Sequence, residues 1–272
     1  MILKQAVALL KATHLVPSLA VASFAVLYGL GLELQPQRVV LVGLAVLTQQ
    51  FSVGLSNDWL DYERDSRVQR KDKPVATGQL AITTVRNFSF LSALLSLVFA
   101  FSLGVAAGLL MIPMLLIGWS YNLGLKANAL SALPYALGFG ILPMFVALSF
   151  QEPTLPAYWV VAVAALLGIS AHFANVLPDL FEDKETGVKA LPHLLGQTLS
   201  SVIIASTAVC ASLIVITQSP DLNPALGQVG FWITVTLSVA ASLMSLRDRP
   251  PRIIFPMLML ASLVNVVLLM FG

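Results

Sequence analysis

Long apolar runs alternate with short polar segments along the whole chain. Crossing a bilayer takes about 20 mostly apolar residues in an α-helix, and nine windows of the sequence have that character. A transmembrane β-barrel would show short segments of alternating polarity instead. The pattern therefore predicts an all-α polytopic membrane protein with nine transmembrane helices, at roughly 15–32, 39–56, 86–105, 107–124, 132–150, 158–177, 198–217, 229–246 and 253–271.

The composition narrows the class of protein further. Of the 272 residues, 58% are hydrophobic and only 10% are charged, against about 25% charged in an average soluble protein. The mean hydropathy is +0.88, which is more apolar surface than a soluble fold of this size can bury. A net charge of +2 gives no electrostatic argument for a nucleic-acid partner. We expect one transmembrane domain over residues 1–272, surrounded by membrane lipid.

The basic residues predict the orientation of the helices. With nine spans, 14 of the 15 Lys and Arg residues fall at one membrane face, and Arg38 alone falls at the other. Cytoplasmic connections carry the excess of basic residues in multi-pass proteins, so we expect the N-terminus and the polar connections of that face in the cytoplasm. Residues 20–22 resemble a signal-peptidase site, but the apolar run continues past them, so the first helix is expected to be retained in the cell membrane.

Two acidic segments stand out on the predicted cytoplasmic side. One follows the second window and the other follows the sixth, and together they hold nine of the 13 acidic residues: Asp58, Asp61, Glu63, Asp65 and Asp72, then Asp179, Glu182, Asp183 and Glu185. A shift of 118 positions (175 minus 57) aligns the segments at five identical residues between 57 and 74. The aligned pairs are Asn57 with Asn175, Asp61 with Asp179, Asp65 with Asp183, Lys71 with Lys189, and Pro74 with Pro192.

This alignment predicts an internal repeat. The shift equals four spans, and an even number of spans preserves the direction of the chain, so the repeat is parallel, with its axis along the membrane normal. We expect two four-helix halves, roughly residues 1–130 and 131–250, and an extra helix at 253–271, all around a central cavity. The two acidic segments should then face each other across that cavity.

The spacing of the acidic residues points to a bound cation. Positions 57, 61 and 65 lie on one face of a helix, as do 175, 179 and 183. Like charges in that register destabilise a helix, and the cost of desolvating them grows near a bilayer. Carboxylate and amide oxygens suit a hard divalent ion, and Mg²⁺ binds one or two carboxylates together with substrate phosphate. We therefore expect a Mg²⁺ site at each segment.

Basic residues beside the acidic ones predict that an anion binds with the metal. Arg67, Lys71 and Lys73 follow the first segment, Lys189 follows the second, and Lys126 lies at the end of the fourth window. Cations next to a metal held by carboxylates form a pocket for a polyanion such as diphosphate. The remaining basic residues look like orientation and lipid-headgroup charges; they include Arg64, Arg70 and Arg252. The three histidines, His14, His172 and His193, lack the spacing of metal ligands and are interpreted as structural.

The chain resembles the UbiA superfamily of intramembrane prenyltransferases. The resemblance covers nearly the whole sequence: an NDxxDxxxD pattern at Asn57, Asp58, Asp61 and Asp65, a DxxxD pattern at Asp179 and Asp183 with Asn175 one turn earlier, and a Tyr and Lys pair at Tyr121 and Lys126. It implies Mg²⁺-dependent transfer of an isoprenyl group from a prenyl diphosphate to a small lipophilic or aromatic acceptor.

The resemblance also implies roles for individual residues. Asp58, Asp61 and Asp65 are expected to hold one Mg²⁺, and Asp179 and Asp183 the other. Asn57 and Asn175 would contact metal or phosphate oxygens. The diphosphate would be bound by Arg67, Lys71, Lys73, Lys126 and Lys189, with a hydrogen bond from Tyr121.

Two other functions fit parts of the same pattern. A terpene cyclase would use the same ionisation with no second substrate. A transporter of a divalent cation or an anion could also have parallel repeats, although ionisable residues of transporters usually lie at mid-membrane rather than at helix ends on one side. The acceptor, the length of the prenyl chain, the general base and the oligomeric state are not specified by the sequence; a quinone-precursor ring is the first expectation on frequency alone.

Overall fold

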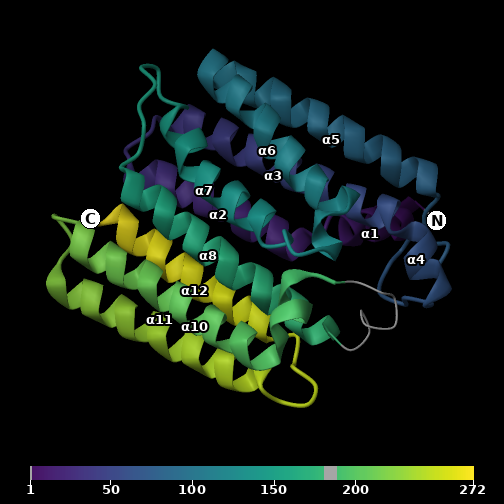
Figure 1. Ribbon diagram of the computed structural model, residues 1–272. Helices are drawn as coiled ribbons and strands as arrows, with labels where there is room; N and C mark the ends of the chain where they lie inside the picture. The colour runs from purple at the N-terminus through teal and green to yellow at the C-terminus, as the bar shows by residue number, and fades with distance from the viewer. Residues whose placement is uncertain (1, 181–188) are drawn as a thin grey trace.

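The computed structural model describes residues 2–180 and 189–272, and over this part of the chain it is helical without a β-strand (Figure 1). Asp183 therefore lies outside the described residues. The long helices are α2 (Leu15–Gly31), α3 (Pro36–Leu60), α5 (Ile82–Leu103), α6 (Val105–Leu123), α7 (Leu133–Ala147), α8 (Tyr158–Val176), α10 (Leu191–Gln218), α11 (Pro224–Ser245) and α12 (Ile254–Met270). Each predicted window overlaps one of them.

Local sequence signals set several helix ends. Proline occupies the first turn of α3, α7, α10 and α11, where its missing N–H has no helical partner to lose. The side chain of Asn223 accepts hydrogen bonds from the backbone N–H groups of Ala225 and Leu226 at the start of α11. The turn between α5 and α6 lies at Gly104, with φ of 141°, slightly before the predicted boundary between the windows 86–105 and 107–124. A glycine is needed there because residues with a Cβ rarely adopt that backbone conformation.

Within the part of the chain that the structure describes, six helices are long and apolar enough to cross a membrane by themselves: α3, α5, α6, α8 with its 3₁₀ extension, α10 and α11. Helices α1 (Ile2–Ala12) and α2 form a bent pair that meets the same test together, with a bend of 61°. Helices α7 and α12 are apolar but shorter. The protein is thus an all-helical integral membrane protein, while the count of nine spans stays a prediction.

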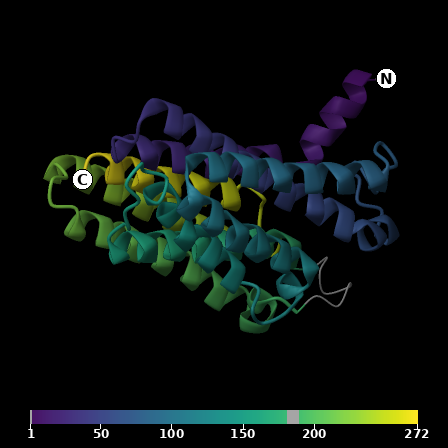
Figure 2. The same ribbon diagram turned by 90° about the horizontal axis from the view of Figure 1, so that it is seen from above.

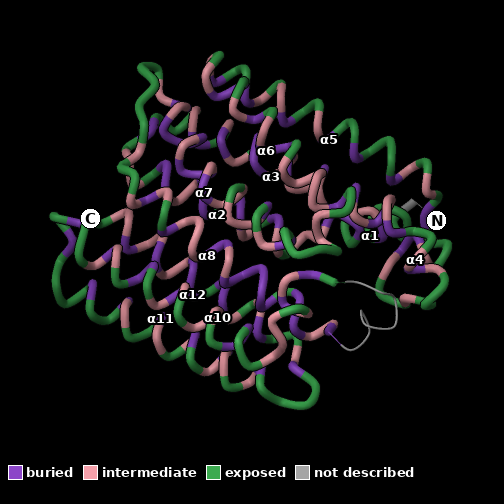
Figure 3. Tube along the Cα trace, in the orientation of Figure 1, coloured by how far each residue is buried: buried purple, intermediate pink, exposed green. Residues whose placement is uncertain are grey.

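The packing of the helices forms a ring. Within the described residues, α2 contacts α3, and the contacts continue through α6, α7, α8 and α12 back to α2. Helix α5 packs outside the ring on α3 and α6, and α10 and α11 pack outside it around α8 and α12 (Figure 1). Purple, buried stretches follow the inner faces of the helices, and green, exposed stretches follow the outer faces of α5 and α11 (Figure 3). The last helix therefore closes the ring by joining its two halves.

One basic residue holds the far end of this bundle together. The guanidinium of Arg38, near the start of α3, donates hydrogen bonds to the carbonyl oxygens of Leu103 at 2.8 Å and Ser149 at 2.7 Å. These carbonyls lie at the end of α5 and just after α7, where helical partners are missing. Arg38 thus caps two chain segments at the membrane face opposite the acidic segments.

The N-terminal helix packs on one end of the bundle, where its Ala8 and Ala12 are buried together with Leu55 of α3 and Val85 of α5. Helix α1 projects away from the other helices at the N-terminal end (Figure 2). Its break from α2 occurs at His14, whose φ is 52°. A Cβ at Gly54 of α3 would lie 2.5 Å from the carbonyl oxygen of Thr13, so the glycine permits a close approach of the break to α3. That approach positions His14 beside the end of α3.

Candidate active site

The first acidic segment and the described part of the second, up to Leu180, lie at the same end of the bundle (Figure 1). The first covers the end of α3 and the short helix α4 (Tyr62–Arg67), and Asp61 is the residue between the two helices. The second covers the end of α8 and the 3₁₀ helix η2 (Leu177–Asp179). Because α3 and α8 both end at this face, the carboxylates gather around the end of the ring.

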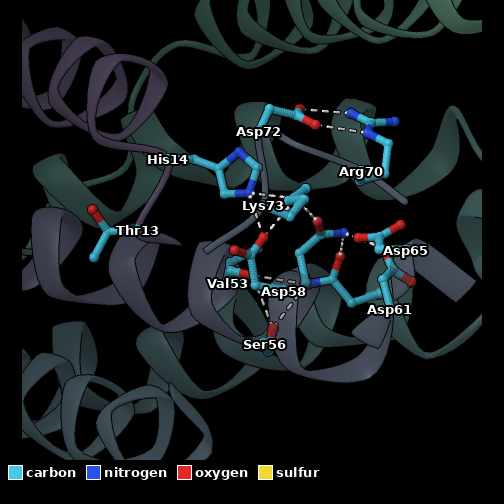
Figure 4. Close-up of polar contacts among 12 residues, drawn as sticks. Thr13, His14, Val53, Ser56, Asp58, Asp61, Asp65, Arg70, Asp72 and Lys73 are labelled. Atoms are coloured by element: carbon cyan, nitrogen blue, oxygen red, sulfur yellow. Dashed lines mark hydrogen bonds and ion pairs between the residues drawn. The ribbon is translucent and has the colours of Figure 1, made fainter. Parts of the chain in front are cut away.

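Asp58 forms the centre of one polar cluster. It is 2% exposed, and its Oδ1 accepts a hydrogen bond from Lys73 Nζ at 2.5 Å. His14 Nε2 lies 3.2 Å from the same oxygen and 3.1 Å from Lys73 Nζ. Lys73 also donates to Asn57 Oδ1 at 3.0 Å. Figure 4 shows His14, Lys73 and Asp58 directed toward one another, so the break between α1 and α2 contributes to the site.

Asp61 forms a second cluster with residues of two other elements. Lys126, in the 3₁₀ helix η1 (Leu125–Ala127), donates to its Oδ1 at 2.6 Å and its Oδ2 at 2.5 Å. Arg64 donates to Oδ2 at 3.0 Å, and Asn57 Nδ2 donates to the same oxygen at 3.1 Å. Burial lowers the pKa of Lys126, and the charge of Asp61 opposes that shift. The lysine predicted to bind diphosphate is therefore a counter-ion of Asp61 in this structure.

Asn122 of α6 connects the Asp58 cluster to the neighbouring helix by hydrogen bonds. It is 5% exposed, and its Nδ2 donates to the carbonyl oxygen of Val53 and to Ser56 Oγ, both at 2.8 Å. Its Oδ1 accepts from Asn57 Nδ2 at 3.1 Å. All three bonds join α6 to α3, so Asn122 fixes the rotation of Asn57 between Asp61 and Lys73.

Asp65 is the third carboxylate of the first segment. It is 2% exposed, and burial raises its pKa, although Lys73 and Arg64 act in the opposite direction. Arg64 contacts its Oδ1 at 3.3 Å, whereas its Oδ2 is buried with no hydrogen-bond partner. Asp58 Oδ2 is also buried without a partner. Two orphaned carboxylate oxygens in one cluster are unusual, because buried polar atoms nearly always have a partner.

These orphaned oxygens bear on the expected magnesium. Among the described residues, no three His, Cys, Asp or Glu side chains are close enough together to hold a metal ion. The donor set nevertheless fits Mg²⁺, which binds one or two carboxylate oxygens and completes its shell with water and phosphate. Asp58 and Asp65 each offer a free buried oxygen for that purpose. The residues present therefore suit the ion.

The second segment is held by residues from three elements. Asn175 Nδ2 donates to the hydroxyl oxygen of Tyr135 in α7, at 3.4 Å. Asp179 Oδ1 lies 3.4 Å from Arg252 Nη2. The backbone N–H of Lys189 donates to the carbonyl oxygen of Ala127 at 3.2 Å, next to Lys126. The connection between α6 and α7 thus reaches both acidic segments.

An ion-pair chain joins the two segments at the face of the bundle. Arg70 donates two hydrogen bonds to Asp72, at 2.9 and 2.8 Å. This pairing lowers the pKa of Asp72 to about 2, and it raises the pKa of Arg70, with smaller contributions from the charges of Asp179 and Asp65. Arg252 Nη1 lies 3.9 Å from Asp72 Oδ2 while its Nη2 contacts Asp179. One guanidinium therefore spans both acidic segments.

Two predicted diphosphate-binding residues lie at the outer surface. Arg67 is 80% exposed and pairs with Glu63 at 3.6 Å, and Lys71 is exposed. Conversely, Arg64, Arg70 and Arg252 contact site carboxylates although their sequence pattern suggested orientation charges. Of these three arginines, only Arg64 has a sequence spacing that indicates a contact with a site carboxylate, because it lies three residues after Asp61 and can share a helical face with it.

Aromatic residues separate the carboxylates from an apolar pocket. The ring of Tyr135 lies 5.3 Å from that of Tyr121, 5.0 Å from that of His172 and 6.2 Å from that of Phe139, on which it stacks. His172 Nε2 lies 3.0 Å from Ser131 Oγ, and the backbone N–H of Leu191 donates to the same hydroxyl. The structural interpretation of His172 agrees with these contacts.

The pocket continues from Phe139 toward the opposite membrane face. Its walls come from four helices of the ring, α2, α7, α8 and α12, and include Phe24, Tyr28, Phe139, Leu142, Leu167 and Leu269. Nearly all of the surface that lines this pocket is apolar or aromatic. The site therefore combines charged groups at the mouth of a helical ring with an apolar space inside the ring.

A membrane-embedded helical ring with paired acidic segments at one mouth defines an intramembrane enzyme-like site for an amphipathic substrate. The profile of the UbiA prenyltransferase family matches residues 15–263. Since this is most of the chain, the protein belongs to the UbiA prenyltransferase family, and the resemblance seen in its motifs is confirmed.

Two curated relatives are similar over part of their length. The bacteriochlorophyll synthase 33 kDa chain of Cereibacter sphaeroides is 28% identical over 193 residues, which are 66% of this chain and 62% of the relative. The digeranylgeranylglyceryl phosphate synthase of Methanothermobacter thermautotrophicus is 26% identical over 191 residues, which are 68% of this chain and 64% of the relative. The chain thus spans somewhat less than two thirds of the length of these relatives.

Solved structures share the fold. A UbiA homologue from Aeropyrum pernix in its apo form has a TM-score of 0.76 at 16% identity, covering 91% of this chain and 94% of that one. A UbiA homologue from Archaeoglobus fulgidus bound to DMAPP and Mg²⁺ has a TM-score of 0.72 at 17% identity, covering 95% and 98%. At these identities the likeness establishes the fold of the membrane domain.

Proposed function

We propose that this protein transfers an isoprenyl group from a prenyl diphosphate to a lipophilic acceptor within the membrane, in a reaction that depends on Mg²⁺. The observation that carries the proposal is that Arg252 contacts a carboxylate of each acidic segment, Asp72 and Asp179. In addition, Asp58 and Asp65 of the first segment each have a buried carboxylate oxygen without a partner among the described residues. Membership of the family supports it, as does a related fold bound to DMAPP and Mg²⁺.

The reaction breaks the allylic C–O bond of the diphosphate, and the diphosphate leaves with the electron pair. The acceptor then forms the new bond to the allylic carbon and loses a proton. Bound Mg²⁺ would neutralise the charge that develops on the departing diphosphate. For this role we assign Asp58, Asp61 and Asp65 to one ion, and Asp179 and Asp183 to the other.

The chain's own cations complete the charge stabilisation. Lys73 and Lys126 lie between the carboxylates, where they can donate to phosphate oxygens, and such charge-assisted bonds are among the strongest in proteins. We assign diphosphate binding also to Asn57, Arg67, Lys71, Tyr121, Asn175 and Lys189. The aromatic rings and the apolar pocket below them would hold the isoprenyl chain and exclude water from the allylic cation.

The orientation and organisation of the chain are part of the proposal. The excess of basic residues at the face of the site supports a cytoplasmic N-terminus and cytoplasmic acidic segments. The common direction of α3 and α8 supports the parallel repeat with halves near 1–130 and 131–250 and an extra helix at 253–271. An aromatic acceptor of the quinone-precursor type stays a prediction; the names of the relatives point instead to a bacteriochlorophyll and to a glyceryl phosphate product.

The test uses membranes that contain the protein and the native lipophilic acceptor, incubated with Mg²⁺ and radiolabelled geranylgeranyl or farnesyl diphosphate. Asp61→Ala and Asp179→Ala should abolish the release of diphosphate while the protein still inserts and elutes as a folded species. Asp221→Ala is the matched control, because Asp221 is an exposed aspartate in the connection between α10 and α11. Wild-type turnover by either site variant would contradict the assignment. Ion flux in proteoliposomes without diphosphate release would indicate a transporter, and a hydrocarbon product without acceptor would indicate a cyclase.

A further inference from the structure

The connection between α11 and α12 contributes a cation to the site. Arg252 precedes α12 by two residues, and its side chain is 65% exposed. Its Nη2 lies 3.4 Å from Asp179 Oδ1, and its Nη1 lies 3.9 Å from Asp72 Oδ2. The guanidinium therefore stands beside Asp179 at the mouth of the ring, although it belongs to neither acidic segment.

The contacts of Arg252 with other described residues are long, and they use few of its hydrogen-bond donors. A guanidinium has five N–H donors in a planar fork, and ion pairs with good geometry bring N and O to about 2.7–2.9 Å. Asp72 already receives two bonds of 2.9 and 2.8 Å from Arg70, so it needs no further donor. Exposed ion pairs of this kind contribute little stability. Arg252 can therefore exchange its present partners for a stronger one at small cost.

The position of Arg252 complements the other cations of the site. Lys73 and Lys126 are mostly buried and form short ion pairs with Asp58 and Asp61, both in the first segment. Arg252, by contrast, contacts Asp179 of the second segment. A diphosphate bridging the two segments needs donors from both directions, and a guanidinium binds phosphate oxygens in bidentate geometry.

We propose that Arg252 is a diphosphate-binding residue, whose guanidinium moves from Asp179 to the diphosphate oxygens when the substrate enters between Asp179 and the first acidic segment. This inference rests on the proposed function and adds a binding residue from the α11–α12 connection. It also explains why Asp179 is paired in this structure: the guanidinium neutralises the carboxylate until the site is filled.

The experiment measures the binding of inorganic pyrophosphate with Mg²⁺ by isothermal titration calorimetry, using the full chain in detergent. Arg252→Gln should raise Kd about tenfold, the effect of losing one well-formed charged contact. Arg249→Gln is the matched control, since Arg249 is an exposed arginine of the same connection, and its Kd should equal that of the wild type. In the turnover assay, Arg252→Gln should raise KM for the prenyl diphosphate and leave KM for the acceptor unchanged.

An Arg252→Gln variant that binds pyrophosphate as tightly as the wild type, or more tightly, overturns the inference, because Arg252 would then only restrain Asp179. Should this variant fail to fold, Arg252→Lys decides: weakening by about threefold or more supports a bidentate contact, and unchanged binding overturns it. A wild-type protein that binds no pyrophosphate with Mg²⁺ refutes the proposed function as well, so the two failures are distinguishable.

Discussion

Asn122 offers the most direct test of how the first acidic segment is held in place. The substitution Asn122→Leu keeps the approximate volume of the side chain and removes both of its polar atoms. It thereby deletes three hydrogen bonds between α6 and α3: those to the Val53 carbonyl, to Ser56 and from Asn57. No acidic or basic residue is changed, so the effect isolates the support of the site from its charges.

The expected magnitude follows from the number of bonds. Hydrogen bonds between membrane helices contribute about 0.6 kcal/mol each on average, so three bonds should contribute about 2 kcal/mol. For a protein of roughly this size, 1 kcal/mol shifts the melting temperature by about 2–4 °C. We therefore expect Asn122→Leu to lower Tm by about 4–8 °C. Asn57 keeps its bonds to Asp61 and Lys73 but loses its anchor, so the Mg²⁺ concentration for half-maximal turnover should rise.

The assay is thermal unfolding in detergent, followed by diphosphate release at several Mg²⁺ concentrations. Asn128→Leu is the control, since Asn128 is exposed and its hydrogen bonds are local, to Gly124 and Leu130. If the two variants melt within about 2 °C of each other, the reasoning on interhelical bonds is refuted. An Asn57→Ala and Asn122→Leu double mutant with strictly additive effects would refute the coupling between these two residues.

Three further predictions concern other parts of the molecule. Gly54→Val should lower the free energy of unfolding by about 1–3 kcal/mol, because a Cβ at this position would lie 2.5 Å from the Thr13 carbonyl oxygen. The measurement is Tm, and equal Tm values for the variant and the wild type would show that the break between α1 and α2 does not pack on α3. Arg38→Met should lower Tm through the loss of two bonds to carbonyls yet leave KM for prenyl diphosphate unchanged, and a raised KM would place Arg38 in the site. Arg70 holds the pKa of Asp72 near 2, below its ordinary value of 3.8. The ion pair therefore stabilises the fold above about pH 4 and loses this effect as the pH falls toward 2. The Tm difference between wild type and Asp72→Asn should shrink over that pH interval, and a constant Tm difference would contradict an ionic origin of the stabilisation.

The helices and the acidic segments were predictable because each depends on local sequence. An apolar run of sufficient length can only be a helix in a bilayer. The single helix expected to carry positions 57, 61 and 65 is interrupted, because α3 ends at Leu60 and Asp61 lies between α3 and α4. The turn at Gly104 was displaced from its predicted place because the apolar run continues through it, and only the backbone conformation marks the break.

The partners of the carboxylates were not predictable in the same way. His14, Asn122 and Arg252 reach the site from three different elements, and none stands in a periodic relation to an aspartate. Hydropathy places a residue on a membrane face, but it carries no information about which neighbouring helix that residue will meet. The sequence therefore indicated a lipid-headgroup charge at Arg252, whereas the packing of α12 in the ring brings this arginine to Asp179.

The pairing of carboxylates with cations has a consequence for the order of binding. A buried carboxylate without a partner is costly, and in this structure Lys73 and Lys126 meet that need for Asp58 and Asp61. A divalent ion that takes over the carboxylates leaves these lysines without a counter-ion in a poorly solvated place, and burial already disfavours the charged form of Lys126. A diphosphate arriving with the ion supplies the missing negative charge at the same position. We therefore expect Mg²⁺ and diphosphate to bind with positive cooperativity, each raising the affinity of the other by the same factor. Calorimetric titration of Mg²⁺ with and without pyrophosphate measures that factor, and a factor of one would show that the lysines do not link the two ligands.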